Sequence, residues 1–230
     1  RCASDSLPYD LHRPTFIIHL EHKDLNEISG LSPSGEAGIL CAISDERGEV
    51  LFIDANGGGA IKRRVLFRDK GDFEGVEKVD DCLYAIKSDG DLYKISHWQR
   101  KKPKYKKYIT GLSKADDVEG LGYDRLRNAL LIACKGDPDS ATIRPVFAFD
   151  LRTKRLGSKP VFVIDPLEVN QLIPYDEHDK HHYFSASGVA VHPLTGDVYV
   201  LSTALKRLVV LDYHSGKIKM AARSGLRPFR

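Results

Sequence analysis

The sequence predicts an all-β fold built from repeated units, on three observations. A glycine that opens an apolar strand recurs at Gly30, Gly75, Gly120 and Gly188, in steps of 45, 45 and 68 residues. Three further strand-like runs follow each of these glycines, separated by turn residues. No stretch keeps the apolar spacing of a helix over a dozen residues. Repeated four-stranded units of about 40 to 50 residues are typical of the blades of a β-propeller.

Each unit is expected to be a meander of four antiparallel strands, the first opened by the glycine. The second strands are expected at 38–44, 82–87, 129–134 and 197–202. The third strands are expected within 49–56, 91–98, 145–152 and 207–214, and the more charged fourth strands within 60–67, 104–110, 159–165 and 217–223. All-β chains of this length commonly form one domain. We therefore expect a leader segment over residues 1–14 and a single propeller domain over 15–230.

Three segments lie outside the regular units. The strand-like run at Thr15–Leu20 precedes the first unit, and we expect it to complete the last blade and lock the ring. The long third step predicts an exposed excursion over Asp165–Phe184. A further step of 45 residues would place the next opening glycine beyond Arg230, with residues 225–230 as its lead-in. We therefore predict a five-bladed propeller whose fifth blade is incomplete at the C-terminus.

Composition and charge exclude several classes of protein. The net charge of +3 is spread evenly, which does not favour a nucleic-acid partner. The basic run at 100–107 suits an exposed outer strand whose lysines prevent edge-to-edge pairing. No apolar run is long enough for a transmembrane helix. Three of the four cysteines, Cys41, Cys82 and Cys134, lie in apolar runs far apart, which predicts buried free thiols rather than a zinc site.

The first residues raise the question of export. Arg1 to Ser6 resemble the start of an exported, lipid-anchored protein, and Met220 is the sole methionine. A lipid-anchor cysteine normally follows a small residue, however, and Arg1 precedes Cys2 here. A trimmed terminus explains this start equally well.

Acidic residues gather around the opening glycines. The residue before the glycine reads Ser29, Glu74, Glu119 and Ser187, and the residue three before it reads Glu27, Asp72, Asp117 and Ser185. The innermost strand of each blade lines the channel, so these side chains should meet at the axis. Carboxylates so close repel one another unless a cation binds between them, and oxygen-only donors favour calcium. The predicted ligands are Glu74, Glu119, Glu27, Ser187, Asp72 and Asp117, with Asp45 as a further candidate. The alternative is that the glutamates accept backbone hydrogen bonds and water fills the channel.

The order of motifs resembles a known family. The runs "NEISGLSPSG", "GDFEGVEKVDDCLYAIKSDGDLYKI", "DVEGLGYD" and "SASGVAVHPLTGDVYVLST" are similar to the SdiA-regulated family of bacterial β-propellers, which includes calcium-regulated periplasmic proteins. The resemblance covers about Asn26 to Leu211. It implies five blades, distant kinship with NHL repeats, a periplasmic or outer-membrane location and bound calcium. The family's acidic positions correspond to Glu74 and Glu119, with Glu27 and Ser187 as looser matches.

Two classes of function remain. The first is a monomeric calcium-binding scaffold or sensor whose rim loops engage an envelope protein or a small ligand. The second is a calcium-dependent hydrolase of esters or phosphoesters, with the axial ion polarising the substrate. The repeats place mostly Ser, Ile and Val near the axis rather than catalytic bases, which favours binding. Three histidines at 178, 181 and 182 could bind zinc, but they lie in the expected excursion, where charged residues are usually solvated.

Overall fold

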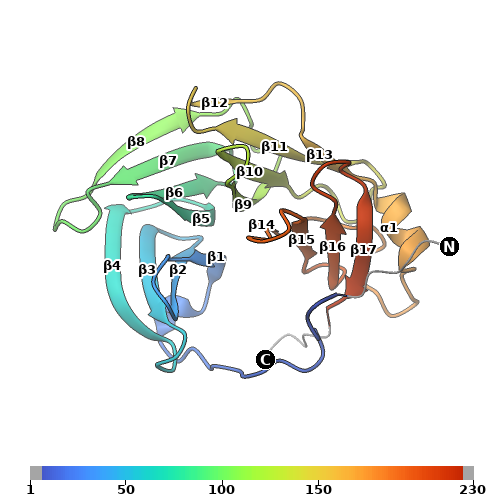
Figure 1. Cartoon of the computed structure of the whole chain (residues 1–230), viewed down its shortest axis with the longest axis horizontal. Coiled ribbons are helices and arrows are strands. Elements are labelled where there is room, and N and C mark those ends of the chain that lie inside the picture. The colour runs from blue at the N-terminus through green and yellow to red at the C-terminus, as the bar shows by residue number, and fades with distance from the viewer. Residues whose placement is uncertain (1–6, 225–230) are drawn as a thin grey trace.

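Four antiparallel sheets are arranged around one axis in the computed structural model, which describes residues 7–224 (Figure 1). Strands that are consecutive in the chain are neighbours in each sheet, except that the last strand of the third sheet returns to pair with the third strand. Each sheet is therefore built on a meander whose first strand lies innermost. The predicted all-β propeller fold is therefore confirmed.

The strand boundaries follow the expected units closely. The first blade contains β1 (Ile28–Pro33), β2 (Ile39–Ser44), β3 (Gly48–Asp54) and β4 (Ala60–Arg68). The second contains β5 (Phe73–Val79), β6 (Cys82–Lys87), β7 (Asp91–Ser96) and β8 (Lys104–Ile109). The third contains β9 (Val118–Asp124), β10 (Ala129–Cys134) and β11 (Arg144–Asp150), with β12 (Arg155–Leu156) and β13 (Phe162–Ile164) both paired to β11. The fourth contains β14 (Gly188–Val191), β15 (Val198–Ser202), β16 (Arg207–Leu211) and β17 (Ile218–Arg223).

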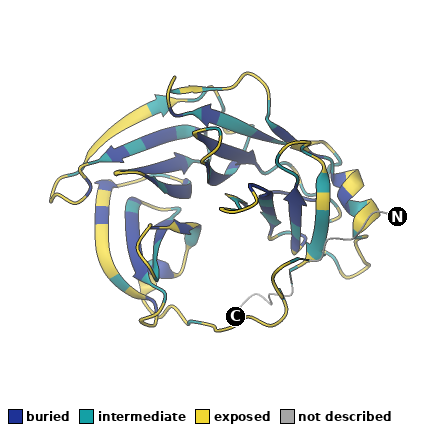
Figure 2. Ribbon diagram, viewed as in Figure 1, coloured by how far each residue is buried: buried dark blue, intermediate teal, exposed yellow. Residues whose placement is uncertain are grey.

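Neighbouring blades pack face to face, and each contact has its own apolar core. Phe52 of the first blade stacks on Trp98 of the second, with ring centroids 4.9 Å apart. Leu121 and Phe149 pack between the second and third blades, and Val200 packs between the third and fourth. Figure 2 shows that the middle strands of the blades are mostly buried, whereas outer strands such as β4 and β8 are largely exposed. Strand β8 is almost wholly exposed, as the lysine run predicts.

The repeated glycines allow the inner strands to approach one another. A Cβ added at Gly30 would lie 2.7 Å from the Cα of Gly75, and one added at Gly75 would lie 2.6 Å from the Cβ of Leu121. Real Cβ atoms do not approach other atoms so closely, so a side chain at either position would force the blades apart. A Cβ at Gly188 would meet nothing within 4 Å. The fourth blade therefore faces open space where the first three face a neighbour.

The ring is open between the fourth and first blades, and the N-terminal segment spans this opening (Figure 1). Tyr9 contacts the fourth blade through a 2.9 Å hydrogen bond between its Oη and His192 Nε2. At the other end, Leu25 of the short 3-10 helix η1 (Lys23–Leu25) packs on Leu51 of the first blade.

The strand expected at Thr15–Leu20 does not form, and that prediction is wrong. Phe16 in this segment is 64% exposed. The outer edge of the fourth blade is occupied by β17, and the described residues contain no fifth sheet that could receive another strand. Four blades are thus described where we predict five. Residues 1–6 and the expected lead-in at 225–230 lie outside the described residues.

The segment Asp165–Phe184 is less exposed than expected, because it contains the helix α1 (Pro166–Leu172). Asp165 caps this helix by accepting a 2.8 Å hydrogen bond from the Leu167 N–H, and Pro166 follows at the first helical turn. Val169 and Phe184 are buried in the core between the third and fourth blades.

The three cysteines within the described residues are free, as predicted. Cys41 and Cys134 are buried, and Cys82 is half-buried. Burial is the main cause that raises the pKa of both buried thiols to about 12, so they behave as small apolar side chains.

Replacement of Glu77 by glutamine should stabilise the protein increasingly as pH rises. Glu77 of β5 is 9% exposed, and its burial raises the pKa of the carboxyl to about 8 although the Tyr123 N–H acts in the opposite direction. Between about pH 4.5 and 8 the unfolded chain loses this proton while the folded chain keeps it, so wild-type stability falls as pH rises. Glutamine removes this dependence.

We expect the difference in unfolding free energy between Glu77→Gln and wild type to grow by about 1 kcal/mol per pH unit. Urea unfolding at several pH values between 5 and 8 measures it, with Glu36→Gln at an exposed position as the control. A difference that stays constant with pH would show that Glu77 ionises normally in the folded chain.

Candidate functional site

The inner strands of all four blades enclose a cavity of about 310 Å³ at the axis, which we call the axial pocket. Its walls are formed by Ser29–Leu31, Glu74–Val76, Glu119–Leu121 and Ser187–Ala190, with Tyr199, Leu201 and Leu208 of the fourth blade. The four residues that precede the opening glycines therefore meet in one cavity, as the repeat predicts.

A β-bulge explains why these side chains turn toward the axis. The ladder between first and second strands is interrupted at Ser29, at Glu74 and at Glu119, each of which is left without a partner residue. A bulged residue leaves the alternation of the strand and its side chain is redirected. The bulge recurs at the same place in three blades, so it places three polar side chains around one axis.

Glu74 carries the most perturbed carboxyl of the pocket. Its pKa is raised to about 8, first by burial and then by the negative charges of Glu119 and Asp72. Asp72 also shares a hydrogen bond with Glu74 and accepts one from the Ser88 hydroxyl. Asp45 adds further negative charge, and its buried Oδ1 has no hydrogen-bond partner in the described structure. Near neutral pH Glu74 is therefore largely protonated.

Glu119 is neutralised differently, by a lysine that sequence reasoning missed. The Lys135 Nζ lies 2.5 Å from Glu119 Oε1. Burial acts to lower the pKa of Lys135, but the hydrogen bond to Glu119 and the charges of Glu119, Asp117 and Glu74 raise it overall. Lys135 is therefore a charged ammonium at the edge of the axial pocket.

Lys135 occupies a position that recurs in the first three blades, although its residue type does not recur. Comparing the residues at this position is the step that could have identified Lys135 from the sequence. Lys135 directly follows the second strand of its blade, as Asp45 and Ser88 do in theirs. The backbone carbonyls of all three accept hydrogen bonds from the opening of the next blade, at the Phe73, Val118 and Ala186 N–H groups. The three residues thus occupy equivalent positions, each joined through its backbone to the opening of the next blade.

The remaining predicted ligands lie in varied surroundings. Ser187 lines the pocket, but its hydroxyl donates to the Leu201 carbonyl and accepts from the Thr203 N–H. Asp72 and Glu27 are exposed and do not line the pocket. Asp117 is half-buried with φ of 49°, and its carbonyl accepts the Lys135 N–H at 2.8 Å. The structure therefore brings Glu74, Glu119 and Ser187 together and leaves the others around them.

The oxygen atoms of the axial pocket suit a hard cation. The negative charge of its glutamates, however, is already partly compensated. Every polar side-chain atom supplied by Ser29, Glu74, Glu119 and Ser187 is an oxygen. Between residues 7 and 224, however, no three His, Cys, Asp or Glu side chains are arranged to hold a metal ion. A cation would therefore have to displace the Lys135 ammonium and the Glu74 proton.

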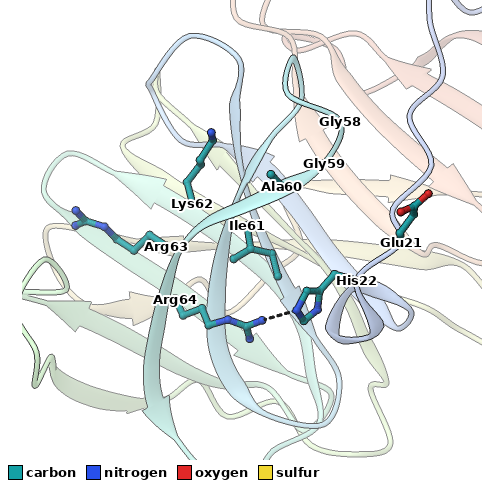
Figure 3. A pocket seen from close by; sticks show the side chains of 9 residues that line it. All are labelled: Glu21, His22, Gly58, Gly59, Ala60, Ile61, Lys62, Arg63 and Arg64. Atoms are coloured by element: carbon teal, nitrogen blue, oxygen red, sulfur yellow. Dashed lines mark hydrogen bonds between the residues drawn. The ribbon is translucent and has the colours of Figure 1, made fainter.

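A larger and more open cavity of about 810 Å³ lies between the N-terminal segment and β4 (Figure 3). Its basic side chains already have partners. Lys62 pairs with Asp54 at 3.1 Å, Arg64 pairs with Asp24 at 2.6 Å, and Arg63 stacks over the ring of Trp98. Because these charges are compensated, this cavity is a weaker candidate than the axial pocket.

The excursion and the helices suggest no other site. The histidines of the excursion contact neighbouring side chains: His181 lies 3.2 Å from Asp139, and His182 packs on the Tyr175 ring.

Of the helices described between residues 7 and 224, none has the length and apolar character that crossing a membrane requires.

Comparison with solved structures supports the fold. A glutaminyl cyclase from Myxococcus xanthus aligns with a TM-score of 0.54 at 16% identity, over 81% of this chain and 73% of that chain. A hydrazine synthase from Kuenenia stuttgartiensis aligns with a TM-score of 0.51 at 15% identity, over 90% of this chain and 52% of that chain. At such identities the likeness extends to the fold alone.

No curated protein matches the chain in sequence. Residues 10–226 match the SdiA-regulated family, which agrees with the motifs that surround the opening glycines. The match spans all four blades and the segment that crosses the opening of the ring. The chain therefore belongs to the SdiA-regulated family.

Proposed function

We propose that the chain is a calcium-binding propeller that acts as a scaffold or sensor in the bacterial envelope, with the axial pocket as its binding site. The observation that carries this proposal is the meeting of Glu74 and Glu119, from neighbouring blades, in one cavity of about 310 Å³. Location in the envelope rests on the family resemblance.

Glu74 and Glu119 would hold the ion, since they are the carboxylates that line the pocket. Bound calcium would supply the positive charge that offsets their repulsion. The pKa of Glu74, raised to about 8 by burial and by Glu119, means that this carboxyl must lose a proton before it can serve as a ligand. Binding should therefore strengthen as pH rises toward 8 and release protons.

A binding role suits the walls of the pocket better than catalysis does. They consist mainly of glycine backbone and of aliphatic side chains such as Leu31, Leu201 and Leu208, and no histidine is among the described residues that line them. A rigid ring with variable loops at its rims is a common platform for partners. Hydrolysis of an ester by this pocket would contradict the proposal.

Calcium should raise the melting temperature of the wild-type protein. An ion at about 100 times its dissociation constant stabilises by about 2.7 kcal/mol, which corresponds to roughly 5–10 °C for a domain of this size. Glu74→Gln and Glu119→Gln should each reduce this shift, and the exposed Glu36→Gln should keep it. An unchanged shift in both pocket variants would place the ion elsewhere, and no shift in wild type would refute calcium binding.

A further inference from the structure

Lys135 places a cationic group where the proposed ion would bind. Its Nζ lies 2.5 Å from Glu119 Oε1, and the side chain is 38% exposed whereas that of Glu119 is 18% exposed. Lys135 is not itself among the residues that line the axial pocket, so its ammonium meets Glu119 at the edge of that pocket. The equivalent positions of the first two blades carry Asp45 and Ser88, which present oxygen atoms.

We propose that Lys135 is an internal competitor for the axial site: its ammonium holds Glu119 while no cation is bound and must leave the carboxylate when one binds. This inference rests on the proposed function, and it names the residue that sets the affinity and selectivity of the site.

Only the side chain of Lys135 is free to move. The Lys135 N–H donates to the Asp117 carbonyl at 2.8 Å, and the Lys135 carbonyl accepts from the Ala186 N–H at 3.2 Å. The next residue, Gly136, lies against Arg144, since a Cβ there would be 2.5 Å from Arg144 Cδ. Because the backbone of Lys135 is fixed and its four-carbon stem is flexible, the ammonium acts as a ligand of Glu119 that is tethered nearby. Its effective concentration at the carboxylate is therefore high.

A tethered ammonium discriminates between entering cations by charge. A sodium ion carries the same charge as the ammonium that it would displace, and it must also compete with the high local concentration of the tether. A calcium ion carries twice that charge and can bind both Glu119 and Glu74. Lys135 should therefore exclude monovalent cations from the site and lower the affinity for divalent ones.

Calorimetric titration with calcium chloride and with sodium chloride tests this role. Lys135→Met removes the charge and keeps an unbranched apolar side chain, and we expect it to bind calcium about tenfold or more tightly than wild type. Lys135→Arg keeps the charge and should bind as wild type does. Lys135→Ser, which copies Ser88, is a second neutral variant in case Lys135→Met fails to fold.

Lys107→Met is a closely matched control. Lys107 pairs with Asp91 at 2.6 Å, with side chains that are 42% and 19% exposed, but it lies on the outer strand β8. Its loss should leave calcium binding unchanged.

The outcomes separate this inference from the proposed function. Tighter calcium binding by Lys135→Met or Lys135→Ser, but not by Lys107→Met, supports the inference. If wild type and both neutral variants bind calcium equally, Lys135 is no competitor although the proposed function stands. If only the neutral variants bind, the inference holds and calcium binding by wild type is refuted. If none of the proteins binds calcium, both fail.

Discussion

Alanine at Gly30 or Gly75 is expected to destabilise the propeller by about 1–3 kcal/mol, whereas alanine at Gly188 should leave its stability unchanged or raise it slightly. All three glycines lie at equivalent positions near the start of the first strand of a blade. At Gly30 the added methyl would lie 2.7 Å from a backbone Cα, and at Gly75 it would lie 2.9 Å from the Leu121 backbone nitrogen. Backbone cannot rotate away as a flexible side chain can, so the inner strands would have to separate.

Gly188 is the internal control because the same methyl would meet nothing within 4 Å. Its replacement also lowers the conformational entropy of the unfolded chain, which favours folding. Denaturant unfolding of the three variants measures these differences. Equal effects at all three positions would mean that the fourth blade is packed like the others and that the ring is not open at this point.

Replacement of Arg144 by methionine is expected to cost about 3 kcal/mol or more. Arg144 is fully buried at the start of β11, and its guanidinium donates to backbone carbonyls rather than to an acidic side chain. These acceptors are the carbonyls of Asp137, Ser140, Thr142 and Phe184, with the Thr142 hydroxyl. Methionine would fill part of the volume but would leave four carbonyls without this donor, that of the buried Phe184 among them.

The hydrogen bonds of Arg144 join the loop after Lys135 to the segment that enters the fourth blade. Their loss should therefore also loosen the axial pocket. Arg144→Lys keeps the charge but cannot donate in five directions, and we expect an intermediate loss. Arg125→Met, at an exposed position, should change the unfolding free energy by less than about 0.5 kcal/mol. A loss below about 1 kcal/mol for Arg144→Met would show that water replaces the guanidinium.

The sequence predicts the blades because the same physical needs recur from unit to unit. Where one inner strand packs on the next, at Gly30, Gly75 and Gly120, little but a glycine fits, and the apolar runs that follow require burial on both faces. Strands β6 and β10 accordingly begin and end at the predicted residues. The same repeat predicts that Glu74 and Glu119 share a cavity, because equivalent positions in successive blades are related by rotation about the axis.

The features that the sequence did not predict depend on contacts made outside the repeated units or by residues that differ between them. Helix α1 has seven residues, too few to show a helical period, and it forms because Asp165 caps it and Val169 finds a core. The run Thr15–Leu20 has strand-like residues, yet it forms no strand, because β17 already takes the outermost position of the fourth blade. Lys135 differs from its counterparts Asp45 and Ser88, so a search for repeated acids passes over the cation that neutralises one of them.

A double-mutant cycle of calcium binding tests the central claim most directly, namely that Glu74 and Glu119 hold one ion between neighbouring blades. Calcium affinity is measured for wild type, Glu74→Gln, Glu119→Gln and the double variant at about pH 8, where the pKa of Glu74 permits its ionisation. If both carboxylates bind the same ion, their losses should be coupled by about 0.5–3 kcal/mol. Losses that simply add, or a double variant that binds calcium as wild type does, would contradict a shared axial site.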